Sequence, residues 1–506
     1  MSHLGYREEE AVDLEVDYVV VGSGAGGASA AVILARGGAR VAIVEAGAWR
    51  DPEHYPSSTY GAMRDLFDDW GAQITRGRAF WPIVQARTVG GTTVINSAIC
   101  VRTPGDIFAQ WQREHGVGGD ALAERVWAHQ ERIEAELFVE EVPEASRGHS
   151  NRLAMIGAER SGFESHWIRR YTKGCEGRGQ CLQGCRAKKK QSTNLNYIPE
   201  VLERGGHVLS SAPVSKVRFE GKRAVGVEGR FEHPRTKKAG ARFFVRATKA
   251  VLLAASVTHT APLLMASGVK SRALGEGFRS HPGTGVFGIY PDPVDTNTGA
   301  TQGWASTAFR VDPGLKLETL SIPFEMVASR LSGGGLELME KLTEYRNLCM
   351  WVHAVRAESV GTVKRGMFGR PVIHYTLNKQ DMLRFREGIK LVARMHVEAG
   401  CDKLILGIYG MPYSITPDQL ALLDDAPLDP RAYIAVLSHL FGGATMGADA
   451  SRAVTDESGR VHGYEGLVVA DASVIPTNLG VNPQHTIMAL ASVFAEDLLA
   501  AERRGA

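Results

Sequence analysis

The chain has 506 residues, 44% of them hydrophobic and 23% charged, and its formal net charge is +2. This length and apolar content are enough for the cores of two domains, and the near-neutral charge gives no indication of a nucleic acid or an acidic partner. No apolar run approaches the roughly eighteen residues of a membrane span, and six cysteines are too few for a disulfide scaffold.

The first recognisable pattern is a strand, a glycine-rich turn, a helix and a second strand near the N-terminus. Residues 17–21 (DYVVV) predict a buried parallel strand, and GSGAGG follows directly. A helix is predicted over 28–35 and a strand over 40–45. This order and spacing are typical of a dinucleotide-binding unit.

Each residue type in this unit has a physical role. In the G-x-G-x-x-G spacing, Gly22 permits the tight turn, Gly24 lets the backbone approach a pyrophosphate, and Gly27 allows close packing of helix on strand. The helix N-terminus offers free N–H groups to the phosphates. Glu45, at the end of the second strand, is placed to accept hydrogen bonds from ribose hydroxyls. These features do not separate FAD from NAD.

The C-terminal seventy or so residues carry a second pattern. HLFGGATMG begins at His439, DAS occupies 471–473, and an Asn-Pro step follows at 482–483. This arrangement resembles the glucose–methanol–choline (GMC) oxidoreductases, an FAD family, and is most similar to the cholesterol-oxidase and bacterial alcohol-dehydrogenase branches. Further similar segments are 86–104, 251–269 (with Ser256 where glycine is usual), 274–282 and 369–381.

The resemblance implies an α/β fold. A Rossmann-type FAD-binding domain with a parallel sheet is expected to be discontinuous, over 1–105, 190–290 and 430–506. Residues 106–189 are expected to form a helical insertion that ends in a cysteine loop. Residues 291–430 are expected to form an α+β substrate-binding domain with a mostly antiparallel sheet.

The resemblance places the catalytic groups at His439 and Asn482. Histidine suits a general base because its ordinary pKa of about 6.5 lies near working pH; the competing interpretation is a core histidine bonded to backbone. Asn482 is expected to orient the substrate oxygen, since an amide is not a base near neutral pH. Asparagine before proline is also a good helix N-cap, with Pro483 as the first helical residue. His485 is expected to be structural.

The resemblance also implies how the flavin is held. The helix after Asn482 is expected to aim its positive end at the flavin. Ile95 stands where relatives with histidyl flavin have the linking histidine, so the FAD is expected to be noncovalent. The implied cofactor-binding residues are Gly22, Gly24, Gly27, Glu45, Gly90, Gly91, Thr93, Asn96, Val214, Asp471, Ala472 and Pro483.

Three cysteines form a separate motif. Cys175, Cys181 and Cys185 stand in C-x5-C-x3-C spacing within a glycine-rich loop. The spacing resembles that of family dehydrogenases that carry a three-iron 3Fe-4S cluster and pass electrons to a cytochrome subunit. Zinc with a remote fourth ligand and a metal-free loop remain as alternatives. Cys100, Cys349 and Cys401 are isolated and are expected to be core thiols.

The function predicted from these observations is FAD-dependent oxidation of a small-molecule alcohol, with electrons passed to an acceptor other than O₂, such as an electron-acceptor protein. The alternatives are an O₂-using alcohol or sterol oxidase, and a flavin-binding electron carrier without substrate chemistry. The presence of both His439 and Asn482 argues against the electron carrier. The polar, acidic start (MSHLGYREEE) is unlike a secretion signal, and a cytoplasmic location is therefore expected.

Overall fold

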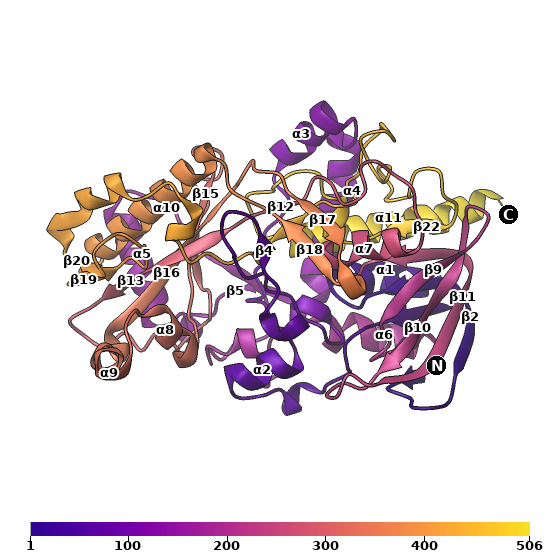
Figure 1. Ribbon diagram of the computed structural model, residues 1–506, viewed down its shortest axis with the longest axis horizontal. Helices are drawn as coiled ribbons and strands as arrows, with labels where there is room; N and C mark the ends of the chain where they lie inside the picture. Colours follow the sequence, from indigo (N-terminus) through magenta and orange to yellow (C-terminus); the bar gives the residue numbers. More distant parts are fainter. Residues whose placement is uncertain (1, 506) are drawn as a thin grey trace.

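The computed structural model describes residues 2–505, and its first large sheet lies at one end of an elongated molecule (Figure 1). The strand order is β1-β8-β3-β2-β11-β10-β9, with β22 also paired to β11. Pairing is parallel from β1 through to β11 and to β22, and antiparallel among β11, β10 and β9. The strands are β1 (Ser2–Leu4), β2 (Val12–Val21), β3 (Val41–Val44), β8 (His207–Leu209), β9 (Val214–Glu220), β10 (Arg223–Glu232), β11 (Ala239–Leu253) and β22 (Leu467–Val469).

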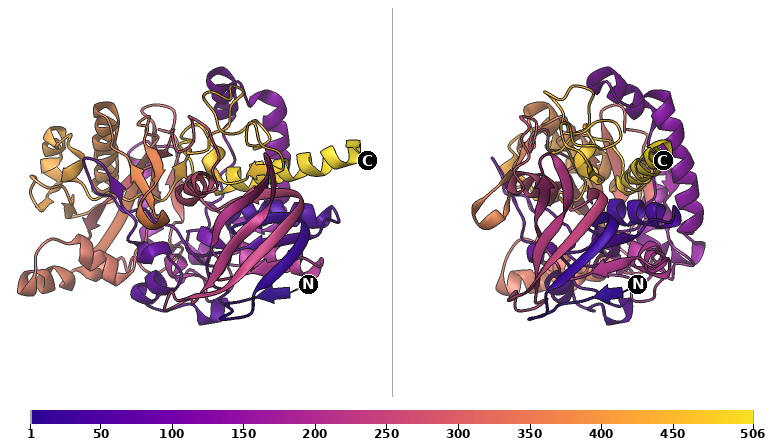
Figure 2. Two further views of the ribbon diagram at one scale, coloured as in Figure 1. Left: turned by 45° about the vertical axis from the view of Figure 1, so that its right-hand side comes forward. Right: turned by 90° about the vertical axis from the view of Figure 1, so that its right-hand side faces the viewer.

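Helix α1 (Ala25–Arg36) follows the glycine turn and packs against both the sheet and the C-terminal helix α11 (Gln484–Gly505). Every residue from Gly26 to Ala35 is buried, because the small and aliphatic side chains of AGGASAAVILAR allow contact on all sides. Figure 2 shows α11 (yellow) running along this part of the molecule toward the C-terminus. The two ends of the chain therefore share one core.

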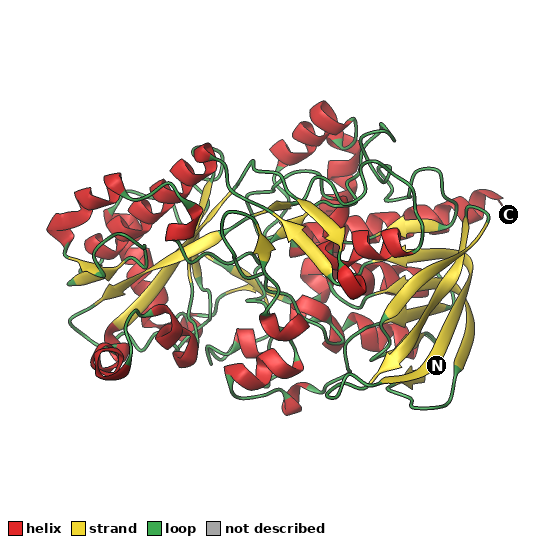
Figure 3. Ribbon diagram, viewed as in Figure 1, coloured by secondary structure: helices red, strands yellow, loops and turns green. Residues whose placement is uncertain are grey.

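The second sheet is antiparallel and lies at the other end of the molecule (Figure 3). Its order is β20-β19-β13-β16-β15-β14-β6, and every pairing is antiparallel. Its strands are β6 (His166–Trp167), β13 (Gly283–Ile289), β14 (Trp304–Ser306), β15 (Leu315–Thr319), β16 (Leu348–Val355), β19 (Lys403–Ile405) and β20 (Ser414–Ile415). The predicted combination of a parallel and an antiparallel sheet is thereby confirmed.

Smaller elements connect the two sheets. A three-stranded sheet contains β17 (Thr362–Arg365), β18 (Pro371–His374) and β4 (Thr75–Arg76), and two-stranded pairs join β5 (Val139–Glu141) to β7 (Arg169–Tyr171) and β12 (Arg279–Ser280) to β21 (Leu440–Phe441). The remaining α-helices are α2 (Thr59–Asp65), α3 (Gly105–His115), α4 (Gly119–Glu136), α5 (Gly148–Arg160), α6 (Tyr197–Glu203), α7 (Val257–Ala266), α8 (Phe324–Arg330), α9 (Gly335–Thr343) and α10 (Lys379–Glu398).

The antiparallel sheet draws strands from more of the chain than 291–430. Strand β13 comes from the segment before it, and β6 comes from the segment 106–189, which also holds α3, α4 and α5. The proposed domain boundaries stay a prediction. Within residues 2–505, no helix has the length and apolar character that crossing a membrane requires.

Candidate active site

One large cavity connects the two sheets. Its volume is about 2210 Å³, and its walls include the glycine turn at one end and the side chains of His439 and Asn482 further along. Ligand pockets in proteins usually measure roughly 300–1,000 Å³. The cavity is therefore large enough for a dinucleotide together with a second molecule.

The glycine turn has the close contacts that the motif predicts. Gly22 has φ +100°, and a Cβ added there would lie 2.2 Å from the carbonyl oxygen of Ala254. A Cβ on Gly27 would lie 2.1 Å from the carbonyl oxygen of Gly22. Gly24 is the N-cap of α1 and provides no side-chain cap, so the N–H groups of the first turn face the cavity end where a phosphate fits.

Gly26 is a further glycine of the turn that the motif does not specify. A Cβ on Gly26 would lie 1.9 Å from the carbonyl oxygen of Ala470, at the end of β22. Any side chain at this position would separate α1 from the C-terminal segment that precedes Asp471. The fit of the two chain ends around the cavity thus depends on this residue.

Glu45 is buried at the end of β3 and faces the cavity. Its Oε2 accepts hydrogen bonds from the N–H and the hydroxyl of Ser23, at 2.9 and 2.6 Å, and its Oε1 accepts one from the N–H of Gly47 at 2.7 Å. Burial raises the pKa of this carboxyl group, although these hydrogen bonds oppose the shift. Glu45 therefore fixes the turn, and its role toward a ribose stays a prediction.

The structure brings most of the residues predicted from sequence to one cavity. Gly27 and Gly90 do not line it: Gly27 packs inside α1, and Gly90 (φ +97°) donates its N–H to the Ser23 hydroxyl at 2.9 Å. Those that line it are Gly22, Gly24, Glu45, Gly91, Thr93, Asn96, Val214, His439, Asp471, Ala472, Asn482 and Pro483. The glycine turn, the helix N-terminus that can bind a phosphate and the size of the cavity together fit FAD.

His439 stands just before β21, with each ring nitrogen facing a polar side chain. Its Nε2 lies 3.2 Å from Asn482 Nδ2, and its Nδ1 lies 3.2 Å from His281 Nδ1. Burial lowers the pKa of His439 to about 4, and burial also lowers that of His281 well below its usual value. Both rings are therefore neutral at pH 7, and a neutral imidazole is able to accept a proton.

The sequence interpretation missed three residues at this centre: His281, Lys316 and Glu318. Lys316 lies on β15 with 1% of its surface exposed, and its ammonium group donates to Asn482 Oδ1 and, at 2.5 Å, to Glu318 Oε1. His281 lies in the family-like segment 274–282, and for Lys316 and Glu318 the signal in the sequence is LKLET, in which charged and apolar residues alternate. That alternation is equally typical of a strand with a solvent-exposed face.

The Asn482 side chain does not cap a helix. Helix α11 begins at Gln484, and the carbonyl of Pro483 accepts from the N–H of Ile487 at 2.9 Å. The helix thus starts one residue later than the N-cap interpretation requires, and the Asn482 amide contacts Lys316 and His439 instead. His485 is buried between the Tyr171 hydroxyl (2.7 Å) and Glu134 Oε1 (3.2 Å) and does not line the cavity.

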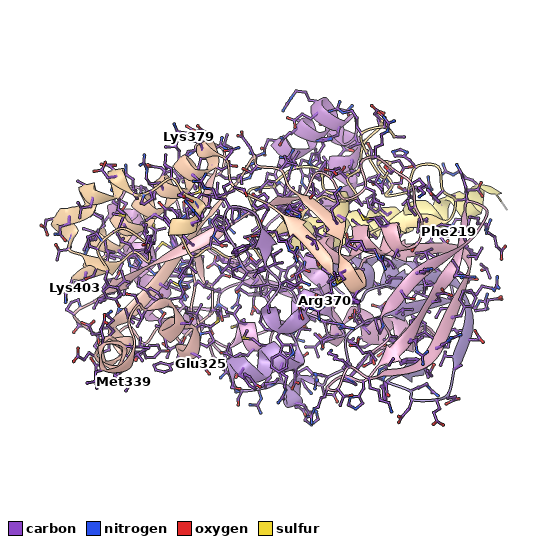
Figure 4. The ribbon with its side chains drawn as sticks, in the orientation of Figure 1. Phe219, Glu325, Met339, Arg370, Lys379 and Lys403 are labelled. Atoms are coloured by element: carbon purple, nitrogen blue, oxygen red, sulfur yellow. The ribbon has the colours of Figure 1, made fainter. Side chains whose placement is uncertain are left out.

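In the part built by β15, β16 and α8, the cavity wall combines apolar side chains with the polar Gln302, Ser329 and Arg330, and exposed apolar side chains line other parts of the cavity. The wall there includes Leu320, Ile322, Met350 and Val352. The β17–β18 turn lines the mouth and carries Met367 and Phe368, which are 77% and 93% exposed, and Arg370 marks this turn in Figure 4. Trp70, 45% exposed, lines the cavity beyond α2.

The three loop cysteines line a second, smaller cavity of about 40 Å³. Arg170 is buried beside them, with Nη2 3.0 Å from Cys181 Sγ and Nη1 3.5 Å from Cys175 Sγ. Within residues 2–505, these three sulfur atoms do not all lie within 4.8 Å of one another, as ligands of a single ion would. The arrangement therefore does not favour zinc as it stands.

The cysteine cavity adjoins the large one. Lys190 is buried, and its ammonium group donates to the carbonyl oxygens of Asn96 at 2.8 Å and Cys181 at 3.1 Å. Leu182 and Gln183, which follow Cys181 directly, line the large cavity. One cationic side chain thus joins the cysteine loop to a segment predicted to contact the flavin.

Comparison with known proteins places this geometry in context. Two family models described as GMC oxidoreductase match residues 16–283 and 357–491. An uncharacterized GMC-type oxidoreductase of Mycobacterium tuberculosis is 33% identical over 490 residues, which cover 96% of this chain and 76% of that protein. A long-chain-alcohol oxidase of Arabidopsis thaliana is 28% identical, over 96% of this chain and 67% of that protein. A formate oxidase variant of Aspergillus oryzae shares the fold, with TM-score 0.74 and 19% identity over 98% of this chain and 99% of its own.

Proposed function

Because the chain belongs to the GMC oxidoreductase family, we propose that it is an FAD-dependent oxidoreductase that oxidises an alcohol CH–OH group. The observation that carries the proposal is the 3.2 Å approach of His439 Nε2 to Asn482 Nδ2 inside the cavity that begins at the glycine turn. FAD, when bound, supplies the acceptor for the hydride of the alcohol carbon. The residues proposed to hold it are Gly22, Gly24, Glu45, Gly91, Thr93, Asn96, Val214, Asp471, Ala472 and Pro483.

His439 is proposed to act as the general base. Its Nε2 takes the hydroxyl proton, and its lowered pKa of about 4 keeps this nitrogen free at neutral pH. The Asn482 amide donates a hydrogen bond to the substrate oxygen and so orients it. His281 contacts the other ring nitrogen of His439, Nδ1, and so holds the ring in place. An electron carrier without substrate chemistry would not need this pair, so that alternative is the least supported.

The proposed substrate is an alcohol with a long apolar part. The support is twofold: the wall beyond the histidines contains Leu320, Ile322, Met350 and Val352, and several relatives are named long-chain-alcohol oxidases. Burial of each methylene group contributes about 0.8 kcal/mol, so such a wall favours a chain over a polyol.

We further propose that the electrons leave to an acceptor other than O₂, by way of the cysteine loop. The residues proposed to hold an anionic three-iron cluster are Cys175, Cys181 and Cys185, with the buried cations Arg170 and Lys190 beside them. Their cavity of about 40 Å³ has room for little more than one water molecule, so the loop must open to admit the cluster. The contact of Lys190 with the Asn96 carbonyl supports a connection to the flavin. An O₂-using oxidase is the second candidate, and the names of the relatives favour it.

The FAD is proposed to be bound without a covalent link. Ile95, immediately before Asn96, is buried and has no nucleophilic atom. Protein denatured and precipitated with acid should leave its flavin in the supernatant. Flavin that stays with the pellet would contradict this proposal.

The activity is tested by anaerobic mixing of the FAD-loaded protein with dodecanol, glucose and choline. Loss of the oxidised-flavin absorbance with dodecanol, faster than with the two polar alcohols, is the expected result. Bleaching by glucose or choline alone would refute the apolar substrate class, and bleaching by none of them would count against the activity. Repeating the reaction in air and measuring peroxide distinguishes the oxidase.

A further inference from the structure

A buried lysine fixes the orientation of the Asn482 amide. Lys316, on β15, and Glu318, two residues further on the same strand face, are 1% and 5% exposed. The Lys316 ammonium group donates to Glu318 Oε1 at 2.5 Å and to Asn482 Oδ1. An ammonium group has three donors and no acceptor, so only the amide oxygen of Asn482 is able to face it.

This orientation determines which nitrogen of His439 carries the proton. With its oxygen on Lys316, Asn482 presents its NH₂ group to His439 Nε2 at 3.2 Å. NH₂ only donates, so Nε2 must accept and is unprotonated. The proton of the neutral ring is then on Nδ1, which donates to His281 Nδ1 at 3.2 Å. The hydrogen bonds thus run in one direction, from Lys316 through Asn482 and His439 to His281.

The opposite orientation would disable the site. If the Asn482 oxygen faced His439, it would favour the tautomer with a proton on Nε2, and a protonated Nε2 has no lone pair with which to take the hydroxyl proton. The amide oxygen would also repel the oxygen of an incoming hydroxyl group. In the observed orientation, a hydroxyl between the two residues accepts from Asn482 and donates to His439 Nε2.

We propose that Lys316 is a positioning residue for the oxidation, one that sets the His439 tautomer through Asn482 while Glu318 balances its charge. This inference rests on the proposed function of His439. Lys316 acts without touching the substrate. Removal of Lys316 alone would leave the buried Glu318 carboxylate with its hydrogen bond from Gln302 but without a cation, which is strongly destabilising. The test therefore replaces both residues, as Lys316→Met/Glu318→Gln.

The first measurement does not depend on activity. Nitrogen-15 NMR of histidine-labelled protein, with the His439 signals assigned by their loss in His439→Gln, reports which ring nitrogen is protonated. The native protein should show the Nδ1–H tautomer alone, and the double variant a mixture of both tautomers. The pure Nδ1–H tautomer in the double variant would overturn the inference. Lys341→Met, which removes the partly exposed Lys341–Glu337 ion pair of α9, outside the site, is the matched control.

The second measurement is a double-mutant cycle with dodecanol as the probe. The Lys316→Met/Glu318→Gln pair should lower the limiting rate of flavin reduction by about tenfold or more, a loss on the scale of coupling between residues in contact. In an Asn482→Ala background the same pair should change the rate by less than about twofold, since the residue it acts through is gone. Equal losses in both backgrounds would indicate a purely structural role. An unaffected rate in His439→Gln would instead refute the proposed function and leave the tautomer result to stand by itself.

Discussion

The main-chain N–H of Ser256 donates a hydrogen bond to Asp471 Oδ2 at 2.9 Å, although 215 positions separate the two residues. The same oxygen accepts from the Thr260 hydroxyl at 2.6 Å, and Oδ1 accepts from the N–H of Ser473 at 2.8 Å. Asp471 thus joins the start of α7 to the segment after β22. Its carboxylate holds the cavity wall together, in addition to the cofactor contact proposed for it.

Replacement of Ser256 by glycine should stabilise the protein. Ser256 has φ +83° and ψ +162°, a region that is essentially reserved for glycine and strains other residues by about 1–3 kcal/mol. Glycine keeps the N–H that binds Asp471 and loses the half-buried hydroxyl contacts to Gln85, Thr258 and His259. We expect Ser256→Gly to raise the free energy of unfolding by about 1 kcal/mol, measured by urea denaturation. Ser256→Ala, which keeps the strain, should give no gain; equal effects of both would contradict the explanation.

The two catalytic positions should differ in the size of their effects. His439→Ala should lower the rate of flavin reduction by about 10²–10⁴-fold, the scale of a lost general base. Asn482→Ala should lower it less, because it removes a hydrogen-bond donor and leaves the base. Stopped-flow mixing with dodecanol under anaerobic conditions measures both, with flavin content as the control for cofactor loss. A larger loss in Asn482→Ala would reverse the proposed roles.

Stability should fall as the pH drops below about 6.5. Burial lowers the pKa of His396 and His353 to about 3 and that of His439 to about 4. Between these values and 6.5 the unfolded chain binds protons that the folded chain does not, so acid favours unfolding; above 6.5 the effect vanishes. Each group contributes up to about 1.4 kcal/mol per pH unit to this slope.

His396 offers a clean test of that slope, because it does not line the large cavity. It stacks on Trp351 and lies within hydrogen-bond distance of the Tyr290 hydroxyl (3.0 Å) and the Val286 carbonyl (3.2 Å). His396→Gln retains hydrogen-bonding groups but does not titrate. Urea denaturation at several pH values between 4.5 and 6.5, with the native protein alongside, should show a shallower loss for the variant. Parallel curves for the two proteins would exclude His396 as a contributor.

Metal analysis of protein purified without oxygen tests whether the cysteine loop binds an iron–sulfur cluster. About three irons per chain, with matching sulfide, would support the electron relay through Cys175, Cys181 and Cys185. Loss of that iron in Cys181→Ser, together with slower reduction of a dye acceptor, would show that the loop holds the iron and that electrons pass through it. Absence of metal, with rapid peroxide formation from dodecanol in air, would refute the relay and support the oxidase.

The sequence predicted the parts of the site that depend on backbone shape. Gly22 and Gly27 are recognisable because a Cβ at either would meet a carbonyl oxygen at about 2 Å, and such contacts leave a fixed spacing. His439 and Asn482 were assigned by resemblance, and the structure brings them together. Lys316 was not predicted from the sequence. Its burial follows from the pairing of β15 with β16, and the alternation of residues within one strand does not reveal that pairing.

The packing of α11 on α1 has a consequence for synthesis of the protein on the ribosome. Strand β22 joins the sheet and α11 covers α1 only with residues from Leu467 onward. Until those residues leave the ribosomal exit tunnel, the nascent chain exposes the aliphatic surface of α1. Because the cavity needs residues 471–483 as well as the glycine turn, flavin capture should follow synthesis of both segments, and a chaperone that shields α1 until then should raise the yield of folded protein.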